Sequence, residues 1–373
     1  MLLLESGVGN YVMSEGFRYS CFAGNNYLGL ANHPNLVKAA IDGTQKFGLN
    51  FSASRQTTGT SLIHLELEKQ LAKFKQRDDA VVFASGYLGN RILLHILKGE
   101  FDAIYADQSA HSSIIDGIPS GNAQLFFYEH CNVSNLEYQI HKNKSVKPLV
   151  ITDGIFALTG EIAPLDKIYP VVENNNGLLI VDDAHATGVL GENGRGTPEF
   201  FNLGDVPRIF QTETMSKAIG VYGGFIASNT EIIRRIRENS PAYGASTALP
   251  PSLVCAASAA IELVINKPEL RKRLFFNALK IREGCKQLGF LTTNSCAPII
   301  PLFFSNRNDA NDLSDFLKEH YIIAPLVSYP VKTVQFIVRI TVSASHTDQQ
   351  IDELLTVLEQ WKIHKTDSIS LSV

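Results

Sequence analysis

The sequence lacks the features of a secreted, membrane-spanning or nucleic-acid-binding protein. Its five cysteines are odd in number and far apart, without the spacing of metal ligands, so they are expected to be reduced thiols. No apolar stretch reaches the roughly 20 residues that span a bilayer. The start, Met1 to Glu5, has neither the cationic nor the apolar region of a signal peptide. The net charge of −4 favours neither nucleic acid nor an anionic membrane as partner. These absences predict a soluble, cytoplasmic protein.

The composition is that of a globular protein with a substantial core, because 45% of the 373 residues are apolar and 19% are charged. Between residues 79 and 225, short apolar runs alternate with helical patterns. This rhythm predicts an α/β fold with a mostly parallel sheet and helices on both faces. After residues 250–251, a long helical pattern precedes several strands and a final helix over 348–361, which predicts a smaller α+β domain. The expected divisions are an N-terminal segment (1–32), a large domain (33–250) and a small domain (251–373).

The stretch from Gly177 to Phe225 carries the most chemistry. An apolar run over 178–181 leads directly into Asp182, and a second apolar run leads through Thr214 to Lys217. Short apolar runs of this kind are typical of buried strands, and ligands of α/β sheets bind where the strands end. Pyridoxal phosphate (PLP) requires an acid that protonates its pyridine ring and a lysine that binds its aldehyde covalently. The stretch therefore predicts a PLP site.

Lys217 and Asp182 are the strongest candidates. Lys217 has only uncharged neighbours from residue 214 to residue 220, which is unusual for a surface lysine, and burial would make its amine nucleophilic. Asp182 follows four apolar residues, so its carboxylate needs a buried partner, for which a protonated pyridine nitrogen is suitable. The neighbouring Asp183 is better suited to a turn or a helix N-cap.

For each of the other candidates, a purely structural role is an alternative to a role in binding cofactor or substrate. Residues 85–87 lie between a predicted strand and a helix and have the form of a phosphate cradle, since helix N-termini bind anions. His185 is either a core histidine or a partner of the cofactor's phenolic oxygen. His111 either caps the helix that follows it or stacks on the pyridine ring. Arg339 lies on an apolar strand, where it requires either an ion pair or a bound anion.

The order of these motifs resembles the α-oxoamine synthases, PLP enzymes of fold type I that condense an amino acid with an acyl-coenzyme A thioester and release carbon dioxide. The resemblance runs from Asn25 to Thr347 and implies a large domain with a mostly parallel seven-stranded sheet, followed by a smaller α+β domain. The motifs that carry it are 25–30, 53–55 with 59–61, His64 with 67–68, 85–87 with Asn90, Asp107 with His111, 161–165, 182–188, 214–224, 246–247 with 250–251, and 339–340 with 345–347.

The resemblance implies a role for each residue around the cofactor. Lys217 would bind PLP and act as general base, while Asp182 would pair with the ring nitrogen. His185 would contact the phenolic oxygen, and His111 would stack on the ring. The phosphate would be held by the remaining residues of the set, namely the backbone of Gly86 and Tyr87 together with Thr214.

The resemblance also implies partners. The protein would be a homodimer with shared active sites, in which Thr247 reaches the phosphate of the other subunit. Asn25 and Arg339 would bind the carboxylate of the amino-acid substrate. Within the family, residues 53–55 and 59–61 are most similar to members that use alanine, and less similar to those that use glycine or serine. The second substrate would be an acyl thioester of coenzyme A or of a carrier protein.

One motif departs from the family pattern. Where the family commonly has Glu-Gly/Ser-Val-Phe-Ser-Met-Asp-Gly, this chain has residues 153–160, with Ala157 in place of the serine and Thr159 in place of the acid.

Three alternatives to a synthase remain open: another PLP reaction such as transamination, a nicotinamide-binding protein, and a non-catalytic partner subunit. No G-x-G-x-x-G motif follows a predicted strand, which argues against nicotinamide. The presence of Lys217 argues against a non-catalytic subunit.

Overall fold

The computed structural model describes residues 3–118, 124–327 and 336–370, with side chains as far as Lys365. Contacts within the chain define two compact units. The larger unit comprises residues 33–156 and 162–268, and the smaller unit comprises 1–32, 157–161 and 269–373.

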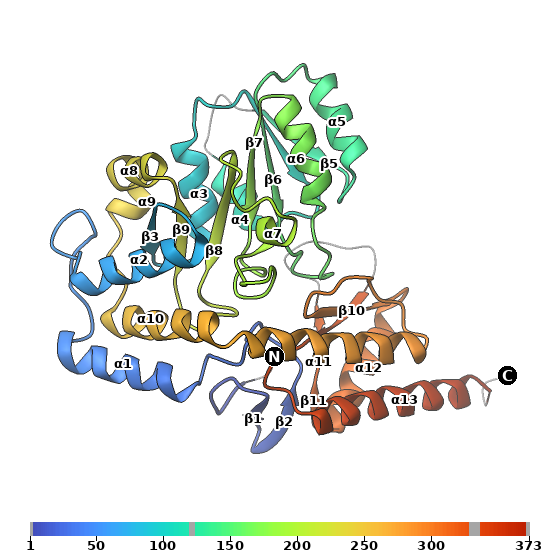
Figure 1. The fold of residues 1–373 in the computed structure, drawn as a ribbon. Helices are drawn as coiled ribbons and strands as arrows, with labels where there is room; N and C mark the ends of the chain where they lie inside the picture. The colour runs from blue at the N-terminus through green and yellow to red at the C-terminus, as the bar shows by residue number, and fades with distance from the viewer. Residues whose placement is uncertain (1–2, 119–123, 328–335, 371–373) are drawn as a thin grey trace. The chain divides into compact units, whose positions relative to one another are not determined.

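The larger unit is built on a seven-stranded sheet with the strand order β3-β9-β8-β7-β6-β4-β5 (Figure 1). Strand β9 runs antiparallel to both of its neighbours, and the other pairs in the sheet are parallel. The predicted fold class is thereby confirmed. The strands are β3 (Asp79–Phe83), β4 (Ala103–Asp107), β5 (Gln124–Tyr128), β6 (Pro148–Asp153), β7 (Leu178–Asp182), β8 (Ile209–Thr214) and β9 (Gly224–Ser228).

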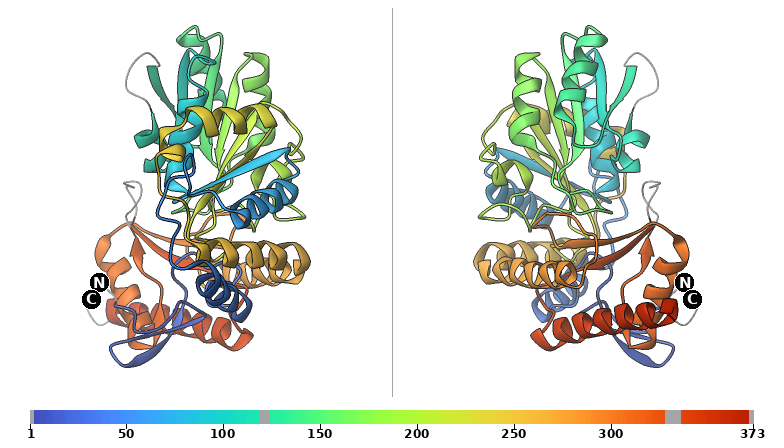
Figure 2. Two further views of the ribbon diagram at one scale, coloured as in Figure 1. Left: turned by 90° about the vertical axis from the view of Figure 1, so that its left-hand side faces the viewer. Right: turned by 90° about the vertical axis from the view of Figure 1, so that its right-hand side faces the viewer.

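Helices cover both faces of this sheet (Figure 2). Along β7, Ile180 packs into one apolar cluster, while Leu179 and Val181 pack into the cluster on the opposite face. A strand buried on both faces must be apolar at every position, which is why 178–181 is a continuous apolar run. One face carries α3 (Tyr87–Ile96), α4 (Ser112–Gly117), α8 (Thr230–Asn239) and α9 (Pro241–Gly244), and the other carries α5 (Val133–Lys142) and α6 (Leu165–Asn174).

Four more helices belong to the larger unit: α1 (Pro34–Phe47), α2 (Leu62–Lys75), α7 (Thr197–Phe200) and α10 (Pro251–Asn266). Helix α10 lies against α1 so closely that a Cβ atom at Gly43 would come within 2.8 Å of Cys255 Sγ and 3.0 Å of the Pro251 carbonyl oxygen. The larger unit therefore extends to Pro268 and includes α10, whereas the sequence analysis placed a boundary after Pro250. That the three expected segments form independent domains stays a prediction.

The smaller unit contains two three-stranded sheets. In the first, β1 (Tyr11–Ser14) pairs antiparallel with β2 (Phe17–Cys21), and β2 pairs parallel with β11 (Ile322–Ile323). The second has the order β10-β13-β12 and is antiparallel throughout. Its strands are β10 (Ile299–Phe304), β12 (Leu326–Val327) and β13 (Phe336–Thr341), and the helices of the unit are α11 (Pro268–Gln287, from Glu269 on), α12 (Arg307–Glu319) and α13 (Asp348–Ser370).

The last helix, α13, ends at Ser370, not at Trp361 as predicted. No proline or glycine follows Trp361 to stop the helical pattern, so the helix continues into the polar tail. Among the described residues, no helix is both long enough and apolar enough to cross a membrane.

His346 is a buried histidine that holds the smaller unit together. Its Nδ1 accepts a hydrogen bond from the Ser343 backbone N–H at 3.1 Å, and its Nε2 lies 2.9 Å from the Cys21 carbonyl oxygen. The carbonyl can only accept, so the ring proton is on Nε2 and the imidazole is neutral. Burial lowers the pKa of His346 to about 4.

This neutral histidine is expected to make the protein acid-labile. The unfolded chain takes up a proton near pH 6.5, while the folded chain resists it until about pH 4, so stability is complete above pH 6.5 and falls as the pH falls. Between about pH 7.5 and pH 5, His346 should account for a loss of about 2 kcal/mol in the free energy of unfolding. Denaturant titrations of His346→Gln should lack this part of the pH dependence. His141→Gln, at an exposed position, should retain it; equal slopes for both variants would contradict the assignment.

Candidate active site

Four neighbouring strands of the large sheet each end in an acidic or hydroxyl residue at the same edge. Strands β4, β6, β7 and β8 are parallel neighbours, so their carboxyl ends lie at the same edge (Figure 1). The register pairs Asp153 with Asp182, and Asp182 with Thr212. The structure thus brings Asp182 and the predicted Thr214 to neighbouring strand ends, as expected from the sequence. Asp107 ends β4 at the same edge.

Asp182 is buried and its carboxylate is held in a fixed orientation. Asn90 Nδ2, on α3, donates to Asp182 Oδ2 at 2.6 Å, and the Ala184 backbone N–H donates to Oδ1 at 3.1 Å. Asn90 is itself fixed, because its amide also contacts Ser113 Oγ at 3.1 Å and Thr212 Oγ1 at 3.0 Å. A carboxylate held in this way is a preorganised acceptor for a cationic N–H group.

His111 lies within electrostatic range of both Asp182 and Lys217. Burial lowers the pKa of His111, the carboxylate of Asp182 raises it, and the ammonium of Lys217 lowers it again. The ring also caps α4, because Nδ1 accepts the Ser113 backbone N–H at 3.2 Å. The capping alternative of the sequence analysis is therefore observed, and the ring still lies beside the acid and the lysine.

Lys217 lies in a tight turn between β8 and β9. The turn is closed by backbone hydrogen bonds from Met215 to Gly223 and from Val221 to Met215, at 2.9 and 2.8 Å. Gly223 has a φ of 137°, which only glycine adopts without strain. Lys217 is half-buried, while the two residues that follow it are fully buried. The glycines of this stretch thus allow the chain to fold back, and the turn fixes the lysine.

The predicted phosphate cradle begins helix α3. The N–H groups of Gly86 and Tyr87 head this ten-residue helix, where N–H groups have no partner within the helix. A Cβ atom at Gly86 would come within 2.6 Å of Thr214 Cβ and 2.8 Å of its Oγ1. Thr214 Oγ1 is also 2.7 Å from Ser216 Oγ. Backbone donors and two hydroxyl groups therefore gather around one point, which fits the phosphate of PLP.

His185 and Asp183 follow the same strand but have different surroundings. His185 is buried in the turn that follows β7, where the Thr187 N–H bonds to the Asp183 carbonyl at 2.9 Å. The Asp183 carboxylate accepts from Thr197 N at 2.9 Å, Thr197 Oγ1 at 2.6 Å and Gln211 Nε2 at 2.6 Å. Asp183 is therefore the turn acid that the sequence suggested, fully engaged within the protein.

The sequence analysis did not include Asp153 among the site residues. Asp153 is buried at the end of β6, and its Oδ2 accepts the His111 backbone N–H at 2.9 Å. Burial raises the pKa of Asp153 well above its usual range, and the carboxylate of Asp182 raises it further, while Lys217 acts in the opposite direction. A weaker signal was present, because Asp153 comes one residue after the apolar run 149–151, while Asp182 follows its run directly.

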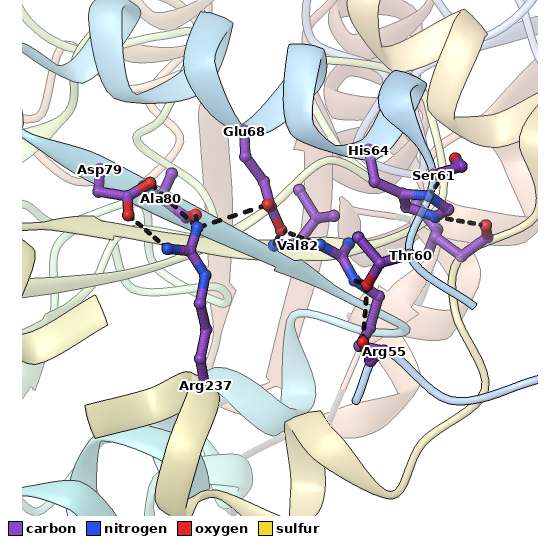
Figure 3. A network of polar contacts seen from close by, with 10 residues as sticks. Arg55, Thr60, Ser61, His64, Glu68, Asp79, Ala80, Val82 and Arg237 are labelled. Atoms are coloured by element: carbon purple, nitrogen blue, oxygen red, sulfur yellow. Dashed lines mark hydrogen bonds and ion pairs between the residues drawn. The ribbon is translucent and has the colours of Figure 1, made fainter. Parts of the chain in front are cut away.

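Thr247 is exposed in the short segment that precedes α10, which we call the strap. The loop 53–60 forms backbone contacts with this segment. Ser54 forms a bridge with Thr247, and the Ala248 N–H bonds to the Ala53 carbonyl at 3.0 Å. The loop is anchored by Arg55, whose guanidinium forms a buried ion pair with Glu68 at 2.9 Å (Figure 3).

The anchor extends further along α2 and β3. Glu68 also accepts the Val82 N–H at 3.0 Å, and Arg237 pairs with Asp79 at 2.6 Å (Figure 3). Arg55, which the sequence analysis used to place the chain within its family, therefore acts as a structural anchor of the loop.

Asn25 and Arg339 lie together in the smaller unit. Arg339 Nη2 donates to Asn25 Oδ1 at 3.0 Å, and the Tyr27 hydroxyl donates to the same oxygen at 3.3 Å. Burial raises the pKa of Tyr27 to about 12. Arg339 Nε is buried and has no hydrogen-bond partner among the described residues, and no ion pair with Arg339 is found among them either. A half-buried guanidinium whose Nε is buried and unused as a donor is suited to a carboxylate.

The sequence profile of the aminotransferase class I and II family matches residues 21–358. The chain therefore belongs to this family of PLP-dependent enzymes, and within it to the acyl-transferring α-oxoamine synthases. It is similar to the 8-amino-7-oxononanoate synthase of Thermoanaerobacter pseudethanolicus, with 38% identity over 96% of this chain and 92% of the relative. Similarity to 8-amino-7-oxononanoate synthase 1 of Bacillus subtilis is 36% over 96% of this chain and 91% of the relative.

Solved structures show the same relationship. A serine palmitoyltransferase from S. paucimobilis with bound PLP has a TM-score of 0.91 at 28% identity, covering 97% of this chain and 92% of that one. An 8-amino-7-oxononanoate synthase from Francisella tularensis has a TM-score of 0.78 at 29% identity, covering 93% of this chain and 98% of that one. The family and the cofactor predicted from the sequence, PLP, are confirmed, and the nicotinamide alternative is set aside.

Proposed function

We propose that this protein condenses a small amino acid, with alanine preferred, with an acyl thioester of coenzyme A or of a carrier protein. The reaction releases carbon dioxide and gives an α-aminoketone, as in an 8-amino-7-oxononanoate synthase of biotin biosynthesis in the cytoplasm. The observation that carries this proposal is the buried Asp182 carboxylate, held by Asn90 at 2.6 Å on the strand beside the one that leads to Lys217. Relatives that the chain covers over 92% and 91% of their lengths are named 8-amino-7-oxononanoate synthase.

Each candidate site residue of the larger unit has a proposed role around the cofactor. Bound PLP supplies a protonated ring that accepts electrons from the α-carbon of the substrate. Lys217 would hold the cofactor and would carry a proton to and from the α-carbon of the substrate. Asp182, whose carboxylate accepts a hydrogen bond from Asn90, would hold the ring nitrogen in its protonated form. The other proposed contacts are His111 with the ring face, His185 with the phenolic oxygen, and Gly86, Tyr87 and Thr214 with the phosphate.

Asn25 and Arg339 are proposed to bind the carboxylate of the amino acid. Holding that carboxylate fixes which bond at the α-carbon is broken. The unused Nε of Arg339 supports this role, since a bidentate carboxylate would use it together with an Nη group.

Arg339→Ala is expected to raise the KM for the amino acid by roughly 10- to 100-fold, because a charge-assisted hydrogen bond is worth about 1.5–3 kcal/mol. PLP binding, measured by absorbance, should not change. Arg339→Lys keeps the charge but lacks the fork of donors, so it should give an intermediate KM. An unchanged KM in the alanine variant would remove Arg339 from the substrate site.

The protein is proposed to be a homodimer with shared active sites. The exposure of Thr247 supports this, together with the backbone anchoring of its strap by loop 53–60. Analytical ultracentrifugation should show a dimer. Thr247→Ala should weaken PLP binding about tenfold, because one hydrogen bond to the phosphate is lost. A monomer that binds PLP tightly would contradict the proposal.

The overall reaction is tested by mixing the holoenzyme with alanine, glycine or serine and a panel of acyl thioesters that includes pimeloyl thioesters. Release of thiol and of carbon dioxide should depend on both substrates and be fastest with alanine. If no thioester releases thiol with any small amino acid, while an α-keto acid is aminated, the protein is an aminotransferase instead.

A further inference from the structure

A second group of reactive side chains lies in the larger unit, apart from the residues assigned to PLP. Asp107 ends β4, and His130 and Cys131 follow the neighbouring strand β5. One side-chain ligand atom of each residue lies within 4.8 Å of those of the other two. The group therefore brings together a carboxylate, an imidazole and a thiol.

The three side chains are arranged in a definite order. His130 Nδ1 is 2.9 Å from Oδ1 of the buried Asp107 carboxylate, so the proton of the neutral ring lies on Nδ1. Nε2 is then left as the basic nitrogen, and it lies 3.9 Å from Cys131 Sγ. A carboxylate that orients an imidazole beside a thiol is the arrangement that activates cysteine nucleophiles.

The surroundings fix this arrangement and argue against a metal site. Asp107 Oδ1 also accepts the Ser109 N–H at 2.8 Å, and Oδ2 accepts the Cys131 N–H at 2.8 Å. Both oxygens are therefore already used as acceptors within the protein. The ring of Phe156 stands perpendicular to the His130 ring, with centroids 4.3 Å apart, and limits its rotation. Asp107 thus acts as the orienting group.

Cys131 differs from the other thiols of the chain. Burial raises the pKa of the buried thiols Cys21 and Cys285. Cys131 is half-buried, and its sulfur lies 3.9 Å from Nε2 of the His130 imidazole. It also directly precedes Asn132, the N-cap of the ten-residue helix α5, and a helix N-terminus favours a thiolate.

We propose that Cys131 is a nucleophilic thiol and a site of covalent modification by soft carbon electrophiles. His130 takes the proton of the thiol, and Cys131 Sγ attacks the electrophilic carbon. A new S–C bond forms, and the bond from that carbon to the leaving group breaks, with the electron pair departing on the leaving group. With iodoacetamide the leaving group is iodide, so no oxidant or further reactant is required.

The test is limited alkylation of the intact holoenzyme with iodoacetamide, followed by mass spectrometry of the cysteine peptides. Cys131 should react at least about tenfold faster than the exposed Cys296. His130→Asn keeps a donor toward Asp107 but removes the basic nitrogen, so it should slow Cys131 about tenfold and leave Cys296 unchanged.

Equal rates at Cys131 and Cys296 in the wild-type protein would overturn the proposal, even if the His130 variant failed to fold. A folded His130→Asn with an unchanged Cys131 rate would also overturn it. If Cys131 reacts only after treatment with a chelator, the group is a metal site and the proposal is wrong.

Discussion

Lys217→Ala is expected to lower turnover by at least roughly a thousandfold, because the enzyme loses both its covalent link to PLP and the group that moves the substrate proton. The measurement is thiol release from an acyl thioester in the presence of alanine. Lys38→Ala is a suitable control, since the Lys38 side chain is 75% exposed and pairs with Asp42 one turn further along α1. The control should have wild-type turnover.

The attachment point of the cofactor can be mapped independently of activity. Borohydride reduction of the wild-type holoenzyme followed by peptide mapping should place the label on Lys217. A label on any other lysine would contradict the assignment, and so would near-normal turnover of Lys217→Ala.

Asp182→Asn is expected to retain PLP but to lose roughly a hundredfold or more in turnover, because an amide cannot stabilise a protonated ring nitrogen. The adjacent Asp183→Asn is a matched comparison. The Asp183 carboxylate accepts hydrogen bonds from Thr197 and Gln211, so its loss should cost about 1–3 kcal/mol in stability and leave kcat little changed. Thermal melts and steady-state kinetics of both variants separate the two effects. Equal losses of kcat would contradict the division of roles.

Much of the larger unit could be predicted because each of its buried strands is marked by a short segment of the sequence itself. Strands buried on both faces give continuous apolar runs, and 178–181 was identified as a strand on that basis. The direction of β9 leaves no such mark, since a short apolar strand reads the same whether its neighbours are parallel or antiparallel to it. Its antiparallel pairing with β8 and β3 is visible only in the structure.

A site residue could be predicted where its own sequence neighbours mark it. It could not be predicted where its importance comes from a contact with a residue elsewhere in the chain. Lys217 stands out against its uncharged neighbours, and Asp182 stands out against the apolar run that precedes it. Asp153 has a comparable position, but its importance comes from its register opposite Asp182 and from the His111 N–H that it accepts. The contact between Asn90 and Asp182 likewise joins residues on α3 and β7. Such pairings depend on tertiary structure, which the composition of a segment does not encode.

The pairing of β2 with β11 sets an order on the synthesis and folding of the chain. Ser20 and Cys21 lie opposite Ile322 and Ile323, so the third strand of this sheet emerges from the ribosome only when most of the chain has been made. The strands of the larger unit all lie between residues 79 and 228 and can form their sheet before that point. Contacts between residues so far apart in the chain close slowly. During translation, the N-terminal hairpin therefore remains an incomplete sheet edge until β11 has been made.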